Sequence, residues 1–191
     1  MRERGFSLVE MLVVVGILMI LGAVAAPTLR AYSVRSSLQA GARVFQGEFR
    51  KARAFAVRSG RQTAIRFETS PAGPVFSVYA DSTWNGVLSA DIAAGRDRRI
   101  AGPFALTGGA PDVRVAILPG TPAIPPDRGT LSTDDPIRFG RSNLVSFSPD
   151  GTATPGTFYL ATRFDQAAVR VAPATARVSF WLCQAGAWRE R

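Results

Sequence analysis

The sequence predicts an α+β protein in which one long N-terminal helix packs on an antiparallel β-sandwich. Three observations support this fold class: an apolar run at the N-terminus, a helical periodicity that continues to Gly60, and an alternating pattern from residue 61 to the C-terminus. The 191 residues suffice for one compact core but are few for two full domains once an N-terminal anchor is set aside. We therefore expect one globular domain on a helical stalk.

The N-terminal apolar run is long enough to enter a membrane. From Met11 to Ala26 every residue is apolar or glycine, and at about 1.5 Å per residue such a helix crosses most of a hydrocarbon core roughly 30 Å thick. Arg2 and Arg4 precede the run, so the positive-inside rule places the N-terminus in the cytoplasm and the rest of the chain outside it. Residues 6–27 are thus expected to form a single membrane span.

One ionisable residue, Glu10, lies within this apolar stretch. A carboxylate is costly in a membrane segment and usually has a function there. An uncleaved signal anchor would explain the span but not the charge. A secretory signal cleaved after the small residues Ala23 and Ala25 is a further alternative, although a charge fits poorly in its apolar region.

The next segment, residues 28–60, has the pattern of an amphipathic helix that ends at Gly60, a natural left-handed cap. Six residues recur at steps of three and four and form one apolar stripe, expected to pack on a sheet: Leu38, Ala42, Phe45, Phe49, Ala52 and Ala56. Five basic residues fall mostly off the stripe and should face water or neighbouring subunits: Arg43, Arg50, Lys51, Arg53 and Arg58.

Residues 61–191 carry the two-residue period of β-strands and form the expected globular β domain. The predicted strands, separated by Gly, Pro, Asp and Asn, are residues 63–68, 75–80, 113–118, 144–151, 157–164, 167–173 and 176–183. Residues 80–111 and 119–136 are rich in Gly, Pro and Asp, and we expect both to be long surface loops.

The composition argues against an enzyme. The chain contains no histidine, the usual general base and commonest metal ligand, and its single cysteine, Cys183, cannot complete a Cys/His metal site. Neither a Gly-x-Ser-x-Gly elbow nor a phosphate-binding loop occurs in the sequence. We expect no catalytic site and no cofactor. The net charge of +9, carried almost wholly by arginine, suits nucleic acid, anionic lipid or an acidic protein alike.

The stretch GFSLVEMLVVVGIL, residues 5–18, resembles the type III signal of type IV pilins and type II secretion pseudopilins. In that family a basic leader ends in glycine, an aromatic residue follows, and glutamate is the fifth residue of the mature chain. The resemblance implies that prepilin peptidase removes residues 1–5 by cleavage between Gly5 and Phe6, and that Phe6 is then N-methylated. Pro27 also matches the family, in which a proline bends or loosens the helix.

The resemblance assigns Glu10 to assembly. Cleavage would free the amine of Phe6, and Glu10 of a neighbouring subunit could pair with it. Such a pair offsets a desolvation cost that either charge would bear alone. The carboxylate would therefore fix the register between subunits.

Two later stretches are similar to the GspH/FimT subgroup of minor pilins and pseudopilins: FRKARAFAVRSGRQTAIRF, residues 49–67, and VSFSPDGTATPGTFYL, residues 145–160. The resemblance implies a minor subunit of a filament anchored in the bacterial inner membrane for type II protein secretion, with its C-terminal domain periplasmic. Its partners would be other pseudopilins and the inner-membrane assembly platform. The family often has a glycine-arginine-valine turn where this chain has Ala176-Arg177-Val178, so the sequence does not favour a positive φ there.

The alternative function is that of a type IV minor pilin which binds DNA during natural transformation. The C-terminal tail carries Trp188, Arg189 and Arg191, and an aromatic residue beside arginines suits flexible or single-stranded nucleic acid. The segment GRDRRI supplies further arginines, Arg96, Arg98 and Arg99, which could meet phosphate or form a solvated loop.

A weak calcium candidate lies in the segment DSTWNGVLSAD. Asp81, Thr83, Asn85 and Asp91 alternate oxygen-bearing side chains with other residues, as in a calcium loop. The last of them is one residue short of the usual closing ligand, and there is no bidentate glutamate. An ordinary turn rich in Asp and Asn explains the segment as well, so we assign no metal.

Overall fold

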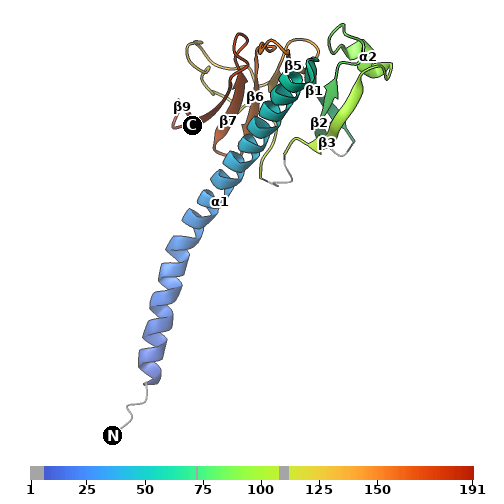
Figure 1. Ribbon diagram of the computed structural model, residues 1–191. Helices are drawn as coiled ribbons and strands as arrows, with labels where there is room; N and C mark the ends of the chain where they lie inside the picture. The colour runs from blue at the N-terminus through green and yellow to red at the C-terminus, as the bar shows by residue number, and fades with distance from the viewer. Residues whose placement is uncertain (1–6, 72, 108–111) are drawn as a thin grey trace.

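The computed structural model describes residues 7–71, 73–107 and 112–191 and has an α+β architecture. A long helix, α1 (Leu8–Ser59), runs from the N-terminus onto a domain of two antiparallel sheets (Figure 1). The first sheet contains β1 (Thr63–Ser70), β2 (Gly73–Ala80), β3 (Arg98–Ala105) and β5 (Leu144–Phe147), in the order β3-β2-β1-β5. The second contains β4 (Ile137–Arg138), β6 (Gly156–Ala161), β7 (Gln166–Val171), β8 (Val178–Gln184) and β9 (Ala187–Glu190), in the order β4-β6-β7-β8-β9.

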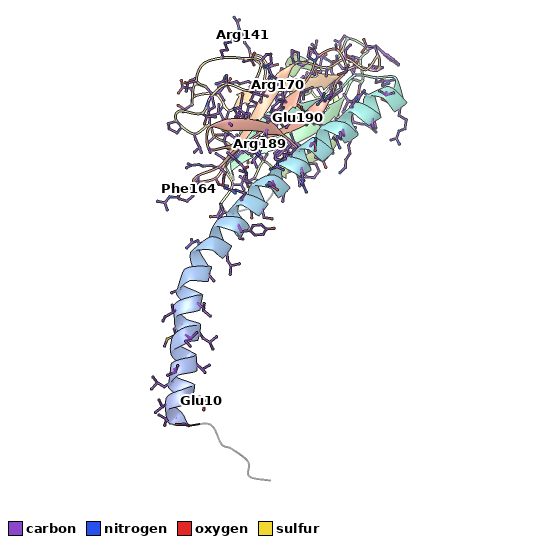
Figure 2. All side chains as sticks on the ribbon, turned by 90° about the vertical axis from the view of Figure 1, so that its left-hand side faces the viewer. Glu10, Arg141, Phe164, Arg170, Arg189 and Glu190 are labelled. Carbon is purple, nitrogen blue, oxygen red and sulfur yellow. The ribbon has the colours of Figure 1, made fainter. Side chains whose placement is uncertain are left out.

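The helix α1 is continuous from Leu8 to Ser59 and passes through Pro27 without a break. At 1.5 Å per residue its length is about 80 Å, and Figure 2 shows it curving along its course. It ends where predicted, because Gly60 has a left-handed backbone with φ of 66°, a conformation that costs glycine little.

The predicted apolar stripe of α1 is confirmed as its buried side. All six side chains, from Leu38 to Ala56, are between 0% and 3% exposed. They face both sheets, since α1 contacts β1 and β5 of the first sheet and β6, β7 and β8 of the second. The five basic side chains predicted to lie off the stripe are exposed. One face of a single helix therefore covers the two sheets together.

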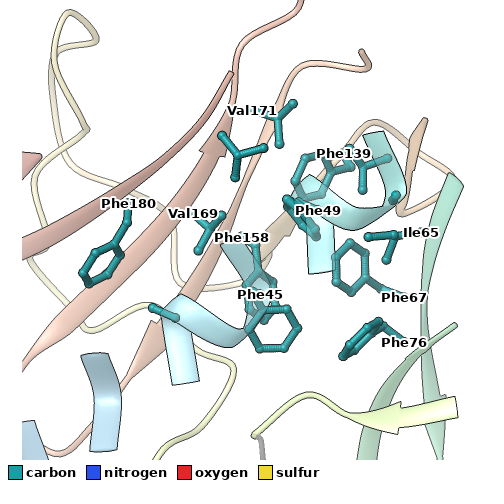
Figure 3. Close-up of a cluster of buried hydrophobic side chains, with 14 of the residues drawn as sticks. Phe45, Phe49, Ile65, Phe67, Phe76, Phe139, Phe158, Val169, Val171 and Phe180 are labelled. Atoms are coloured by element: carbon teal, nitrogen blue, oxygen red, sulfur yellow. The ribbon is translucent and has the colours of Figure 1, made fainter. Parts of the chain in front are cut away.

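Phenylalanine rings fill the space where α1 meets the sheets (Figure 3). The ring of Phe45 on α1 lies 5.2 Å from Phe76 of the first sheet and 4.5 Å from Phe158 of the second, between ring centroids. Phe67 of β1 stacks on Phe158 at 5.4 Å and on Phe139, next to β4, at 5.7 Å. The core is thus continuous through the helix and both sheets.

The predicted loop 80–111 is partly wrong, because it contains regular structure. Residues 98–105 form β3, the outer strand of the first sheet, and Ser89–Ala93 form the short helix α2. Charged residues and a Gly-Pro pair in β3 hide the alternation that marks a strand, and all eight of its residues are exposed or half-buried in this outer position. Two further short strands, β4 and β9, were also not predicted.

The strand predicted at residues 113–118 is wrong. The segment makes only an isolated bridge between Arg114 and Ala161. The buried side chain of Gln166 supplies hydrogen bonds that a neighbouring strand would otherwise make. Its Oε1 accepts a hydrogen bond from the amide of Leu118 at 2.7 Å, and its Nε2 donates one to the carbonyl of Ala116 at 2.9 Å. Val113 and Ile117 are nevertheless buried, so the apolar pattern reported burial and not strand pairing.

The membrane span expected for residues 6–27 is not confirmed. Among the residues that the structure describes, no helix meets the length and hydropathy needed to cross a membrane.

The burial of Phe49 gives a stability prediction for the domain from residue 28 onward. Its ring is 0% exposed and lies 6.3, 5.9 and 6.1 Å from the rings of Phe67, Phe139 and Phe147. Phe49→Ala should lower the free energy of unfolding by about 3 to 5 kcal/mol, measured by urea denaturation, because the cavity cannot close against so many rings. Val57→Ala on the exposed side of α1 is the control and should change it by less than about 0.5 kcal/mol. Equal midpoints for the two variants would show that the stripe does not pack on the sheets.

Candidate functional site

The part of α1 from Leu8 to Leu21 has an exposed apolar surface. Every large apolar side chain from Leu8 to Leu21 is exposed, from 45% for Val14 to 80% for Leu8. The residues surround the helix, and Figure 2 shows this half extending away from the β domain. A helix that is apolar on all sides is normally buried, and an exposed patch of this size marks an interaction site.

Glu10 lies in the first turn of α1, at the end of the helix farthest from the β domain (Figure 2). The carboxylate makes no ion pair within the described part of the chain. Gly5 and Phe6, the predicted cleavage site, lie outside the described residues, and Pro27 lies within α1.

Two of the tail residues proposed for DNA binding, Trp188 and Arg189, lie in β9 and do not share one face, and Arg191 follows the strand. Trp188 and Arg189 are neighbours in β9, so their side chains point to opposite faces of the sheet. The indole of Trp188 is half-buried, packs 6.3 Å from the ring of Tyr159 and donates a hydrogen bond of 2.8 Å to the carbonyl of Pro122. Arg189 and Arg191 are exposed. The two arginine side chains are therefore accessible to a partner, whereas the indole of Trp188 is engaged in contacts within the β domain.

The first calcium-candidate residue, Asp81, is occupied by backbone amides. Its Oδ1 accepts hydrogen bonds from the amides of Thr83 at 2.9 Å and Trp84 at 2.8 Å, and its Oδ2 accepts one from Gly86 at 3.0 Å. The side chain is 5% exposed. This is the geometry of a turn rich in Asp and Asn, in which the carboxylate replaces missing backbone partners.

The last candidate, Asp91 in α2, faces nitrogen donors. Its carboxylate accepts a hydrogen bond of 2.9 Å from Asn85 Nδ2 and forms an ion pair with Arg96. Two hydrogen bonds lower the pKa of Asp91 below its usual value. The bond from Asn85 has the larger effect, and the bond from Arg96 has the next largest. No group of three or more His, Cys, Asp or Glu side chains suited to a metal occurs among the described residues. Of the arginines in this segment, Arg96 is therefore engaged, while Arg98 and Arg99 of β3 are exposed.

A cavity of about 590 Å³ at the junction of α1 and the β domain was missed by the sequence reasoning. Arg30, Val34 and Arg35 line it from α1, and Asp112, Arg163, Phe164 and Asp165 line it from the β domain. Arg35 Nη2 lies 3.1 Å from Asp165 Oδ1. These partners are separated by 130 residues in sequence, so no local pattern could have joined them.

Comparison with known proteins gives two family matches. Residues 41–175 match the family described as Type II transport protein GspH. Residues 1–26 match the prokaryotic N-terminal methylation motif. No curated protein and no solved structure matches the chain. The first match covers α1 from residue 41 and most of the β domain, and the second covers the apolar N-terminal segment. Together they confirm the resemblance found in the sequence.

The two matched regions correspond to two parts of the structure. The first contains the part of α1 that packs on the β domain, and the second contains the exposed apolar part of α1. Because the first match covers more than half of the chain, the protein belongs to the GspH family of type II transport proteins and carries the N-terminal methylation motif of type IV pilin-like subunits.

Proposed function

We propose that this protein is a minor pseudopilin, which prepilin peptidase processes and which assembles into a filament anchored in the inner membrane for type II protein secretion. The observation that carries the proposal is the exposed apolar half of α1, joined to a β domain by the same helix. The match to the N-terminal methylation motif over residues 1–26 supports it. The role is structural, and we propose no catalytic activity.

In this proposal the apolar half of α1 has two successive environments. Before assembly the bilayer covers it, with the N-terminus in the cytoplasm and the β domain in the periplasm. In the filament the helices of other pseudopilins cover it. Either environment removes the exposed apolar side chains from water, at about 1.5 to 3 kcal/mol for each large side chain that becomes fully buried. The transfer of the apolar half from the bilayer to the filament would need two kinds of partner, the assembly platform and the other subunits.

Glu10 would fix the offset between neighbouring helices. The amine freed at Phe6 lies four residues before Glu10 in sequence, which corresponds to about 6 Å along a helix. A pair between Glu10 of one subunit and this amine of the next is therefore compatible with an axial shift of about one helical turn. Because the pair forms only between subunits, it would favour assembly without stabilising the single chain.

The first test concerns processing. The mature chain is expected to begin at Phe6, to carry a methyl group on its amine and to keep the apolar segment. Intact-mass measurement of the protein from the membrane fraction decides this. A chain that begins near Ala26 would mean that the segment is a cleaved secretory signal, and the pseudopilin proposal would be wrong.

The second test concerns Glu10. Glu10→Val should still insert in the membrane, since an unpaired charge has been removed, but it should not enter filaments. Glu48→Gln removes the same charge further along α1, where the side chain pairs with Lys51 at 2.7 Å, and should leave assembly intact. Filament incorporation is measured by shearing and immunoblotting. Normal incorporation of the Glu10→Val variant would rule out a register role for the carboxylate.

DNA binding by a type IV minor pilin remains the second candidate, supported by the exposed arginines. We expect any binding to be diffuse, since Trp188 and Arg189 lie on opposite faces of the sheet. Replacing Arg189 and Arg191 by alanine should weaken DNA retention by the same factor as replacing Arg98 and Arg99, because each pair removes two phosphate contacts. The measurement is DNA retention across a salt series. A loss confined to the tail variant would favour a receptor site instead.

A further inference from the structure

The cavity between α1 and the β domain lies just beyond the apolar half of α1, and its two free arginines have no carboxylate partner. Within the described part of the chain, neither Arg30 nor Arg163 takes part in an ion pair. Both are exposed. Arg35 and Asp165 neutralise each other across the cavity, and Asp112 is the other acidic group that lines it. After this pair, the lining carries the charges of Arg30 and Arg163 against that of Asp112, so the cavity keeps a net positive charge of one.

An exposed aromatic side chain stands beside these arginines. Phe164 is 80% exposed, although it lies in a short turn between two well-buried strands. Figure 2 shows it projecting from the edge of the β domain close to the point where α1 leaves. The guanidinium of Arg163 lies 5.8 Å from the ring centroid of Phe164. On α1, Tyr32 is also exposed, at 75%. Exposed aromatic rings beside arginines are typical of surfaces at a membrane interface.

The turn that carries Phe164 is held firmly against α1. The hydroxyl of buried Thr162 accepts hydrogen bonds from the amides of Phe164 at 3.4 Å and Asp165 at 3.0 Å. The ion pair of Asp165 with Arg35 then joins the turn to the helix. The position of Phe164 along α1 is therefore fixed by the fold, and a change in the tilt of α1 would carry the turn with it.

The depth of these residues relative to a bilayer follows from the sequence. Arg30 lies four residues after Ala26, where the apolar run ends, which is about 6 Å along the helix. The polar layer on each side of a bilayer is about 5 to 7 Å thick, the difference between the whole bilayer and its hydrocarbon core. If the apolar run occupies the core, Arg30 lies at the level of the lipid headgroups, and Arg163 and Phe164 line the same cavity as Arg30.

We propose that the cavity between α1 and the turn 162–165 binds the headgroup of an anionic phospholipid, with Arg30 and Arg163 on its phosphate and Phe164 inserted beside it. This proposal rests on the membrane anchoring of α1 proposed above. Bound in this way, the subunit holds its β domain against the periplasmic face of the membrane until assembly. Extraction into a filament must then break these lipid contacts.

The test places a single nitroxide label on the full-length protein in vesicles. Cys183→Ser removes the native thiol, and one cysteine is then introduced by Phe164→Cys, Leu18→Cys or Arg141→Cys. Leu18 lies in the exposed apolar half of α1, and Arg141 lies at the far side of the β domain from Phe164 (Figure 2). The vesicles contain phosphatidylcholine alone, or with roughly one quarter phosphatidylglycerol to supply the anionic headgroup. Collision of the label with oxygen and with a water-soluble nickel chelate reports its depth.

The expected result is that the label at position 18 lies in lipid, the label at 141 lies in water, and the label at 164 moves to lipid contact when phosphatidylglycerol is present. Each arginine near the surface should favour this contact about fivefold. Arg30→Gln with Arg163→Gln should therefore lower the ratio of lipid-facing to water-facing label at position 164 by about 25-fold. Arg50→Gln with Arg53→Gln, further along the same helix, is the charge-matched control and should have little effect.

Three results would contradict the proposal. If the label at 164 stays in water while that at 18 lies in lipid, the headgroup site is wrong and the anchoring stands. If the label at 18 is itself in water, the anchoring fails and the headgroup site fails with it. If both arginine pairs have equal effects, the attraction comes from the general charge of the protein, and the cavity is not a site.

Discussion

Phe45 and Phe49 lie where α1 meets both sheets, and the packing of their rings determines how the rest of the molecule is arranged. Phe45 contacts Phe76 of one sheet and Phe158 of the other, while Phe49 contacts rings from β1 and β5 and Phe139 beside β4. Neither sheet alone surrounds these rings. The helix therefore joins the two sheets, in addition to the direct stacking of Phe67 on Phe158, and the C-terminal half of α1 is part of the core and not an attached stalk.

This packing also explains why the N-terminal part of α1 is exposed. The stripe that covers the sheets begins at Leu38, Arg30 and Arg35 still line the cavity at the edge of the β domain, and the apolar residues before them extend away from it (Figure 2). The same continuous helix runs through both halves. Under the proposed function, a force on the apolar half would therefore act on the β domain through the packed C-terminal half of α1.

The sequence was most informative where the signal was local. The stripe from Leu38 to Ala56 and the stop at Gly60 follow from helical periodicity and cap chemistry, and both are confirmed. The family resemblance is also confirmed. Distant side chains account for the main failures. Gln166 holds residues 113–118 by its amide and prevents a strand there, and Arg35 reaches Asp165 across 130 residues to form the cavity.

Other differences arise from backbone conformations that side-chain patterns do not report. Ala176 has φ of 47°, so the turn keeps a left-handed backbone although the sequence has alanine in place of glycine, at a cost of about 1 to 2 kcal/mol. Ala176 is fully buried, and its methyl group offsets part of this cost. The tight turn at Ala185 and Gly186, both with positive φ, returns the chain to form β9. Because the chain turns back here, the indole of Trp188 is half-buried against the β domain. The sequence alone predicts an exposed C-terminal tail.

The central claim is that the C-terminal half of α1 and both sheets form one cooperative core, whereas the N-terminal half depends on what surrounds it. Hydrogen exchange of the full-length protein in lipid, followed by mass spectrometry, tests this most directly. The account predicts that amides from Leu38 to Ala56 exchange in the same step as those of β1 and β7, and that removal of the lipid changes protection in residues 8–30 and the turn 162–165 but not from Leu38 to Ala56. Exchange of the amides from Leu38 to Ala56 well before those of β1 and β7 would contradict it.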